Sequence, residues 1–451
     1  MLTAFVGATV LDGRNPMTII PNATVLVRDG KIQSVRQDGA VPSDAKVVSL
    51  QGKFLMPGLI NLHCHLAGNG KPQTIDDSTA NLIQSQLKSR MGRFIMKQMC
   101  ASCAKTELLS GTTTIRTVGG LGNMDAILRD EIESGKRVGP RIVAANEAIS
   151  VPGGHMAGTL AYISHSEEET VSLVRKVAEG KPDLIKLMIT GGTLDVDELG
   201  DENKVLMTPR QINLACEEAH RLGYPVAAHI QGSEGIRVAL ENGVDTIEHG
   251  GYLDDALIAL FKEKGATIVS TLTVAAVMAC LPREISGLSE LYQKSCIALL
   301  ESSISCYRKA IDAGIPVGMG MDNGSPYITH YCTWRELDFF CRYIGVAPEF
   351  ALHTATLKNA EILGMRDQIG SIEPGKYADF LITNENPLLD FSCMAQPYMV
   401  VKQGKIYKNP KFKKYPQYDA LIDSVSQYDH EYRYENAGLT AHAGIGKIEM
   451  T

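Results

Sequence analysis

The stretch that decides the fold is Pro57-Gly-Leu-Ile-Asn-Leu-His-Cys-His65, an apolar segment that ends in two histidines separated by one residue. Its apolar side chains predict a strand, and side chains alternate between the two faces of a strand. His63 and His65 therefore project to one side, and Cys64 projects to the other. Because apolar neighbours bury the pair, each imidazole needs a partner, and a metal ion satisfies both at once.

Seven further short β-type segments follow along the chain, and each is followed by signals of a helix. Two of these signals are capping boxes, at Ser166 to Glu169 and at Thr208 to Gln211. Eight strand–helix units in about 300 residues predict a (β/α)8 barrel, whose reactive groups lie at the C-terminal ends of the strands. The predicted strands are Leu59–His65, Thr112–Val118, Arg141–Ala145, Leu184–Ile189, Val226–Ile230, Asp245–Glu248, Thr267–Thr271 and Pro316–Met321.

The two ends of the chain predict a second, smaller unit. Residues 1–56 and 366–408 contain short strands and turns with little helical periodicity. Strands with one apolar face need a partner layer, so we expect these segments to form one composite β-sandwich domain beside a barrel of residues 57–365. The fold class is thus α/β, a TIM barrel with a small β-sandwich. Residues 409–451 hold five tyrosines and are predicted to be a C-terminal tail.

Composition excludes several classes of partner. The 451 residues carry a net charge of -7, and no run of Lys and Arg exceeds three residues, so we expect no binding to nucleic acid or an anionic membrane. The most apolar run, 267–281, is shorter than the roughly 18 residues that cross a bilayer. We see no secretory signal at the N-terminus, so we expect a cytoplasmic protein, and by default a homo-oligomer.

Three more polar residues end predicted strands in the same way. His229 and His249 each end one strand, and Asp322 follows the last one. A single histidine at such a place is often a structural residue bonded to backbone, but four of them at strand ends favour a metal site. In a closed barrel the last strand lies beside the first, which brings Asp322 next to His63 and His65. Its carboxylate is then a metal ligand, a general base, or both.

Lys186 lies in the middle of the apolar segment 183–189. An unpaired ammonium there is costly, so its pKa should fall and the neutral amine should be populated. Such an amine can act as a nucleophile, form a Schiff base, or take up CO2 to become a carbamate. The carbamate is an anion with two oxygens, suited to bridging two divalent ions.

Three residues in loops are candidates for contacts with a small-molecule substrate. His155 follows the third predicted strand in a glycine-containing loop, and His330 lies in the loop after the last strand. Tyr252 lies just beyond His249. All three are expected at the face of the barrel that carries the reactive groups.

Taken together, these segments resemble the amidohydrolase superfamily of binuclear metallohydrolases, and the resemblance covers nearly the whole chain. Within it the sequence is most similar to the imidazolonepropionase-related branch, which contains Xaa-Pro and Xaa-Arg dipeptidases and ochratoxinase-like amidases. The narrower match rests on Thr190-Gly191-Gly192 after the strand that holds Lys186, and on the loop Gly153-Gly154-His155.

The resemblance implies two divalent metal ions, with zinc expected and manganese, iron or cobalt as alternatives. His63, His65 and Asp322 would hold one ion, and His229 and His249 the other. Lys186, carboxylated on its side-chain nitrogen, would bridge them. Such a pair of cations, about 3.5–4 Å apart, holds a bridging hydroxide at neutral pH. Asp322 would take its proton during attack and return it to the leaving amine.

The predicted activity is therefore hydrolysis of a carbon–nitrogen bond, most simply the amide of a dipeptide or an N-acyl amino acid. Hydrolysis of a cyclic amide, as in imidazolonepropionase, is the alternative. A mononuclear deaminase would need a glutamate three residues after His229, where this chain has Gly232. A non-enzymatic barrel scaffold is the other rival, and it would purify without metal.

Overall fold

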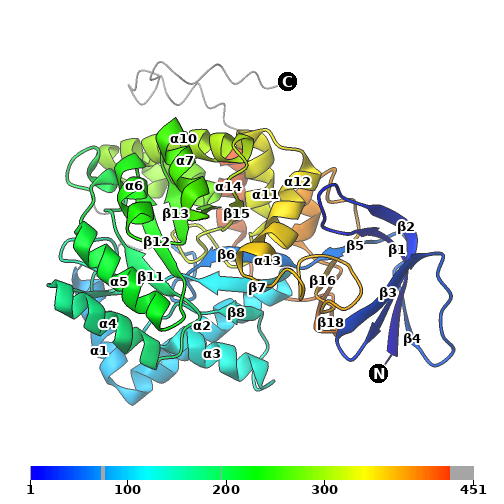
Figure 1. Ribbon diagram of the computed structural model, residues 1–451. Helices are drawn as coiled ribbons and strands as arrows, with labels where there is room; N and C mark the ends of the chain where they lie inside the picture. The colour runs from blue at the N-terminus through cyan, green and yellow to red at the C-terminus, as the bar shows by residue number, and fades with distance from the viewer. Residues whose placement is uncertain (1, 73–76, 194–195, 427–451) are drawn as a thin grey trace.

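The computed structural model describes residues 2–72, 77–193 and 196–426 (Figure 1). Parallel strands and their helices make up the centre of the chain, and a mixed sheet from the two chain ends lies to one side of them. Within the described residues, no helix has the length and apolar character that spanning a membrane requires.

The central strands form two parallel sheets. β6 (Leu59–Cys64), β7 (Thr112–Thr117) and β8 (Arg141–Val143) make the first, in that order. The second has the order β10-β9-β11-β12-β13-β14-β15. Its strands are β9 (Ala148–Ser150), β10 (Ala161–Ile163), β11 (Ile185–Met188), β12 (Val226–Gln231), β13 (Thr246–Gly250), β14 (Thr267–Ser270) and β15 (Val317–Met319).

Backbone hydrogen bonds join the edges of these two sheets. The N–H of Asp322, just after β15, donates to the carbonyl of His63 on β6 at 2.9 Å. On the other side, the N–H of Asp183, before β11, donates to the carbonyl of Ala144, after β8, at 2.6 Å. The eight predicted strands correspond to β6–β8 and β11–β15, with ends that differ by one or two residues, and β9 and β10 are short additional strands.

Helices follow the strands and cover them on the outside (Figure 1). Thr208 and Gln211 form the predicted capping box at the start of α5. Ser166 caps α4, but the side chain of Glu169 bonds the N–H of His165 instead of closing the box. The helices are α1 (Asp77–Lys88), α2 (Arg90–Leu109), α3 (Met124–Glu133), α4 (Glu167–Glu179), α5 (Pro209–Arg221), α6 (Ser233–Glu241), α7 (Asp255–Lys264), α8 (Leu272–Cys280), α9 (Arg283–Ser286), α10 (Glu290–Asp312), α11 (Trp334–Phe339), α12 (Pro348–His353), α13 (Asn359–Ile362) and α14 (Pro416–Ser426).

One further sheet combines strands from both ends of the chain, blue and orange in Figure 1. Its order is β18-β17-β16-β5-β1-β2-β3, with β4 paired to β1, and β5 and β16 join the two halves in antiparallel register. Phe5 and Phe380 pack edge to face at 5.6 Å in a separate core. The strands are β1 (Leu2–Leu11), β2 (Ile19–Arg28), β3 (Lys31–Gln37), β4 (Lys46–Ser49), β5 (Phe54–Pro57), β16 (Phe380–Thr383), β17 (Met399–Lys402) and β18 (Lys405–Lys408).

The first part of the predicted tail packs against the rest of the protein. α14 packs near α8 and α11, and Arg335 on α11 makes an ion pair of 2.7 Å with Asp423 on α14. The N–H of Tyr415 donates to the hydroxyl of Tyr331 at 2.7 Å. Residues 427–451 of the predicted tail lie outside the described part of the chain.

Candidate metal centre

A row of five histidine rings crosses the C-terminal ends of the parallel strands. Ring centroids lie 5.2 Å apart for His65 and His63, and 4.9 Å apart for His63 and His249. The row continues from His249 to His229 at 4.7 Å and from His229 to His155 at 4.1 Å, where the rings stack. Three strands and the loop between β9 and β10 thus bring imidazoles from distant parts of the chain to one line.

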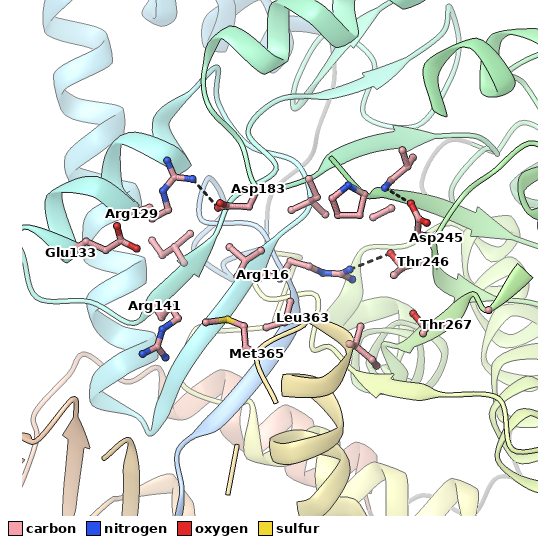
Figure 2. A pocket seen from close by; sticks show the side chains of 18 residues that line it. Arg116, Arg129, Glu133, Arg141, Asp183, Asp245, Thr246, Thr267, Leu363 and Met365 are labelled. Atoms are coloured by element: carbon pink, nitrogen blue, oxygen red, sulfur yellow. Dashed lines mark hydrogen bonds and ion pairs between the residues drawn. The ribbon is translucent and has the colours of Figure 1, made fainter. Parts of the chain in front are cut away.

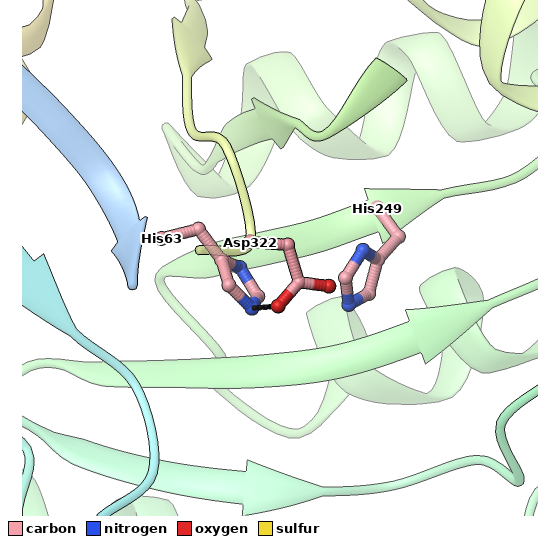
Figure 3. Close-up of side chains that lie close together, drawn as sticks. All are labelled: His63, His249 and Asp322. Carbon is pink, nitrogen blue, oxygen red and sulfur yellow. Dashed lines mark ion pairs between the residues drawn. The ribbon is translucent and has the colours of Figure 1, made fainter. Parts of the chain in front are cut away.

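Asp322 completes one end of this row. Its Oδ1 lies 3.3 Å from Nε2 of His65 and 3.6 Å from Nε2 of His63. Figure 3 shows the carboxylate between the rings of His63 and His249, and the ligand atoms of these three residues lie within 4.8 Å of one another. Two donor atoms that each lie about 2 Å from a tetrahedral zinc ion are about 3.3 Å apart, so the spacing fits a shared ion.

The backbone at two of these positions is unusual. His249 has φ of 69° and Asp322 has φ of 58°, in the left-handed region that L-residues rarely adopt. Strand alternation alone would send Glu248 and His249 to opposite faces, and the positive φ at the end of β13 accounts for both reaching His63. Position 320 must be a glycine for His63 to fit, because a Cβ at Gly320 would lie only 2.5 Å from the Cβ of His63.

The second ring nitrogen of each predicted histidine ligand has a partner that fixes the ring. In His65 and His229 this partner is a backbone carbonyl oxygen, which can only accept a hydrogen bond. The ring nitrogen that faces the carbonyl therefore carries the proton, and the opposite ring nitrogen presents a lone pair. Metal-binding histidines are held in this way. The pairs are His65 Nδ1 with Gly119 O at 2.9 Å, His229 Nε2 with Gly191 O at 2.9 Å, His249 Nδ1 with Thr271 Oγ1 at 2.8 Å, and His63 Nδ1 with Glu248 Oε2 at 2.9 Å.

Burial keeps three of these histidines neutral. It lowers the pKa of His63 to about 4 and holds the pKa values of His229 and His249 well below the usual range. Neutral imidazole is the form that binds metal. Burial also opposes ionisation of Asp322, but His63 and His65 outweigh it, so the pKa of Asp322 lies well below its usual range and the group is a carboxylate.

Lys186 on β11 supplies an amine without a partner. Its side chain is 1% exposed, and its Nζ has no hydrogen-bond partner among the described residues. Burial lowers the pKa of Lys186 to about 8, with Arg116 acting in the same direction and Glu248 against it. An unpaired buried amine is costly, and carboxylation would turn it into an anion that metal ions satisfy. This atom therefore fits the bridging role, and the donor set around it fits two divalent ions.

One cavity contains all six predicted ligand residues. Besides them it is lined by polar side chains and by an apolar wall, much of it from α8 and α10. Lys186 and Asp322 are the ionisable side chains in it other than histidine and cysteine, within the described residues. The polar lining is His155, Thr193, Gln231, Cys296 and Ser325, and the apolar wall is Met156, Met188, Val274, Ala275, Met278, Leu299 and Pro326.

A second cavity lies at the opposite ends of the same strands (Figure 2). Its arginines are engaged within the protein. Arg129 pairs with Asp183 at 2.8 Å, and Arg141 pairs with Asp379 at 2.9 Å. The described lining contains no histidine, so the groups that suit metal chemistry are at the other end of the strands.

The match to a known family agrees with this geometry. The model described as "Amidohydrolase family" matches residues 54–407. The chain belongs to the amidohydrolase family. It is accordingly a hydrolase of carbon–nitrogen bonds, in a family whose members generally use divalent metal ions.

Three similar proteins narrow the comparison. Ochratoxinase of Aspergillus niger is 27% identical to this amidohydrolase over 423 residues, which cover 86% of this chain and 83% of the relative. A putative prolidase structure from Bifidobacterium longum is 33% identical, with a TM-score of 0.82, and covers 94% of this chain and 98% of that chain. A Xaa-Pro dipeptidase structure with methionine bound in its active site is 26% identical, with a TM-score of 0.76, and the match covers 90% of this chain and 100% of that chain. The predicted branch is confirmed, and the neighbours imply a TIM-barrel-type α/β fold.

The three predicted substrate contacts fall in different places in this amidohydrolase. His155 lines the cavity, but Tyr252 and His330 do not. Tyr252 is 41% exposed in the loop after β13, where its carbonyl accepts from Ser233 Oγ. His330 is buried behind the centre. This placement does not support substrate contact by Tyr252 or His330.

His330 instead belongs to a cluster on the far face of β6. Its Nδ1 lies 2.8 Å from Oε1 of Glu107, and its Nε2 lies 2.7 Å from the carbonyl of Gly68. Cys64 Sγ lies 3.8 Å from the same Nδ1, which confirms that Cys64 points away from His63 and His65. Both ring nitrogens of His330 are engaged, so it is not placed to meet a ligand.

Sequence reasoning missed two residues that touch this centre. Glu248 accepts from His63, and Gln231 lines the cavity two residues beyond His229 on the same face of β12. Gln231 Oε1 is buried without a hydrogen-bond partner among the described residues. The signal available was the alternation in β12 and β13, which places His229, Gln231, Thr246 and Glu248 toward the interior.

Proposed function

We propose that the protein is a binuclear metal-dependent amidohydrolase that cleaves an amide bond of a small molecule. The observation that carries the proposal is the convergence on one cavity of four histidines, a carboxylate and a buried amine that has no hydrogen-bond partner among the described residues. A deaminase or an inert scaffold leaves the isolated amine of Lys186 without a role.

The six residues would divide between two ions. His63, His65 and Asp322 would hold one, His229 and His249 would hold the other, and Lys186, carboxylated on Nζ, would link the two. Zinc suits the imidazole and carboxylate ligands, and manganese, iron or cobalt would also fit. When bound, such ions lower the pKa of water and polarise a carbonyl oxygen.

Asp322 is the residue that would move the proton. Its Oδ1 faces both His63 and His65, and Ser325 Oγ donates to the same oxygen at 3.2 Å. The carboxylate would take a proton from the attacking water and give it to the nitrogen of the leaving amine. Proton transfer of this kind contributes about 10² to 10⁴ in rate.

The lining supports a substrate with an apolar side chain. Met278 of α8 and Leu299 of α10 are part of the apolar wall of the cavity, whose polar lining includes His155 and Gln231. The buried oxygen of Gln231 suits an N–H donor of a substrate amide or amine. We propose a dipeptide or an N-acyl amino acid with an apolar group, in line with the dipeptidase neighbour.

The same proposal includes the domain organisation. Residues 57–365 would form a closed (β/α)8 barrel, supported by the hydrogen bonds between its sheet edges. Residues 1–56 and 366–408 would form a composite β-sandwich, supported by the β5–β16 pairing. Residues 409–451 would follow as a C-terminal tail.

The test is a metal count joined to a substrate panel. Protein stripped of metal and CO2 is given Zn²⁺ or Mn²⁺ with and without bicarbonate, and metal per chain is measured. We expect two ions per chain, and full occupancy only when bicarbonate is present. The loaded protein should then hydrolyse apolar dipeptides or N-acyl amino acids. Turnover of cyclic ureides alone would favour the cyclic amide alternative, and a chain that binds no metal would overturn the proposal.

A further inference from the structure

His63 differs from the other predicted histidine ligands in the hydrogen-bond partner of its second ring nitrogen. Its Nδ1 lies 2.9 Å from Oε2 of Glu248, and both side chains are at most 2% exposed. His65 and His229 face carbonyl oxygens, and His249 faces the hydroxyl of Thr271. Within the described residues, His63 is thus the predicted histidine ligand with a carboxylate at its second nitrogen.

Glu248 is itself held on its other oxygen. Nη2 of Arg116 donates to Oε1 of Glu248 at 2.6 Å, and Thr246 Oγ1 donates to the same oxygen at 3.0 Å. With Oε2 on His63, both carboxylate oxygens are occupied and the group cannot rotate without losing a hydrogen bond. The Arg116 cation also balances the buried charge of Glu248, so the pair adds no net charge beside the centre.

Arg116 is fixed from three sides. Its Nε donates to the carbonyl of Leu62 at 2.7 Å, and its Nη1 donates to Thr246 Oγ1 at 3.1 Å, the contact drawn in Figure 2. The side chain is 4% exposed and runs from the cavity at the strand starts to the carboxylate beneath His63. The chain of contacts therefore spans the interior of the parallel strands.

We propose that Glu248, clamped by Arg116, is a positioning residue that makes His63 the strongest imidazole donor of the centre. The carboxylate accepts a hydrogen bond from the Nδ1–H of His63, so Nε2 presents its lone pair on the side of Asp322. A carboxylate at the second nitrogen raises the basicity of a ligating imidazole, and loss of such a partner typically costs about 10- to 100-fold in metal affinity. The ion held by His63, His65 and Asp322 should therefore bind more tightly than the ion held by His229 and His249.

This inference rests on the proposed two-metal function, and its test reads metal affinity instead of turnover. Glu248→Gln alone would leave Arg116 buried beside an amide, so the double variant Glu248→Gln/Arg116→Met removes both charges together. Thr246→Val is the milder second variant, because it removes one hydrogen bond to Glu248 and one to Arg116. Arg129→Gln is the matched control, since Arg129 lines the same cavity at the strand starts but pairs with Asp183.

The two dissociation constants of Zn²⁺ are measured by chelator competition, with bicarbonate present, and the melting temperature of each metal-free variant is measured beside them. We expect the double variant to weaken the tighter ion about 10- to 100-fold and to leave the weaker ion unchanged. Thr246→Val should act in the same direction by a smaller factor, and Arg129→Gln should match the wild type.

Three outcomes would overturn the inference. One is unchanged affinity for both ions in the double variant and in Thr246→Val. Another is equal weakening of both ions in step with a lower melting temperature of the metal-free protein, which would show a purely structural role. A wild-type chain that binds fewer than two ions would overturn the proposed function as well, whereas two ions in the wild type with unchanged variants would overturn this inference alone.

Discussion

The imidazole of His155 stacks on that of His229, with ring centroids 4.1 Å apart and ring planes 17° from parallel. The stack places a second, non-ligating imidazole at the end of the row, in the wall of the cavity. A ring in that position can donate to or accept from a substrate without leaving its neighbour.

Replacing His155 tests this placement. His155→Phe keeps an aromatic ring for the stack and removes both nitrogens, so we expect kcat/KM to fall about tenfold, the value of one hydrogen bond of about 1.4 kcal/mol. Metal content should stay at the wild-type level. Tyr252→Phe is the matched control, because Tyr252 lies outside the cavity lining, and it should leave the kinetics unchanged. Equal effects of the two variants would contradict the assignment of His155.

Lys186→Met should remove at least one metal equivalent and most activity, because the variant keeps the length of the side chain but cannot be carboxylated. Metal per chain, measured with bicarbonate present, checks the prediction. Lys402→Met is a matched control: burial also lowers the pKa of Lys402 to about 8, but its Nζ donates to the carbonyl of Gly139, outside the cavity. Full metal occupancy in Lys186→Met would show that no carbamate bridge exists.

Asp322→Asn should reduce turnover by about 10² to 10⁴, because an amide oxygen can remain near the ions but cannot hold the proton. The folded structure should be little affected, since the amide has the shape of the carboxylate and can still accept from Ser325. Turnover normalised to bound metal, measured together with the melting temperature, separates the two effects. Turnover close to the wild type at equal metal content would remove Asp322 as the proton carrier.

Glu301 on α10 predicts a pH dependence of stability. Burial raises the pKa of Glu301 from near 4.5 to about 7, so folding favours its protonated form. That contribution is complete below pH 4.5 and is lost as the pH rises through 7. Glu301→Gln should therefore gain about 1 to 2 kcal/mol relative to the wild type between pH 5 and pH 8. The free energies of unfolding of both proteins, measured by denaturation between pH 5 and pH 8, check this prediction. A difference between the two proteins that does not change with pH would show that Glu301 does not titrate as stated.

The histidines on strands could be predicted because alternation fixes where a strand side chain points. His63 and His229 lie at strand ends in apolar segments, and the structure brings both to the cavity. Lys186 could be predicted as a functional residue because burying an unpaired amine in an apolar strand is energetically costly. The direction of a strand side chain and the apolar surroundings of a lysine are both set by neighbouring residues, so a single sequence is enough to predict them.

His249 and His330 show what the strand pattern does not contain. In Thr246-Ile-Glu-His249, alternation sends Glu248 and His249 to opposite faces, and the positive φ of His249 that overrides it is a property of the folded chain. His330 lies in a loop, where no period fixes a direction. Its partner Glu107 is distant in the sequence, on α2, and only tertiary packing reveals the pair.

The pairing of β5 with β16 has a consequence for synthesis of the chain. Met56 leaves the ribosome long before Leu381, its partner across the two strands, so the sheet that contains both cannot be completed until most of the polypeptide has been translated. Until then the edge of β5 exposes unpaired backbone groups, which are the surface that invites association with other nascent chains. Removing the last strands would leave that edge open permanently, so truncation near the C-terminus should cost solubility before it affects the chemistry of the distant cavity.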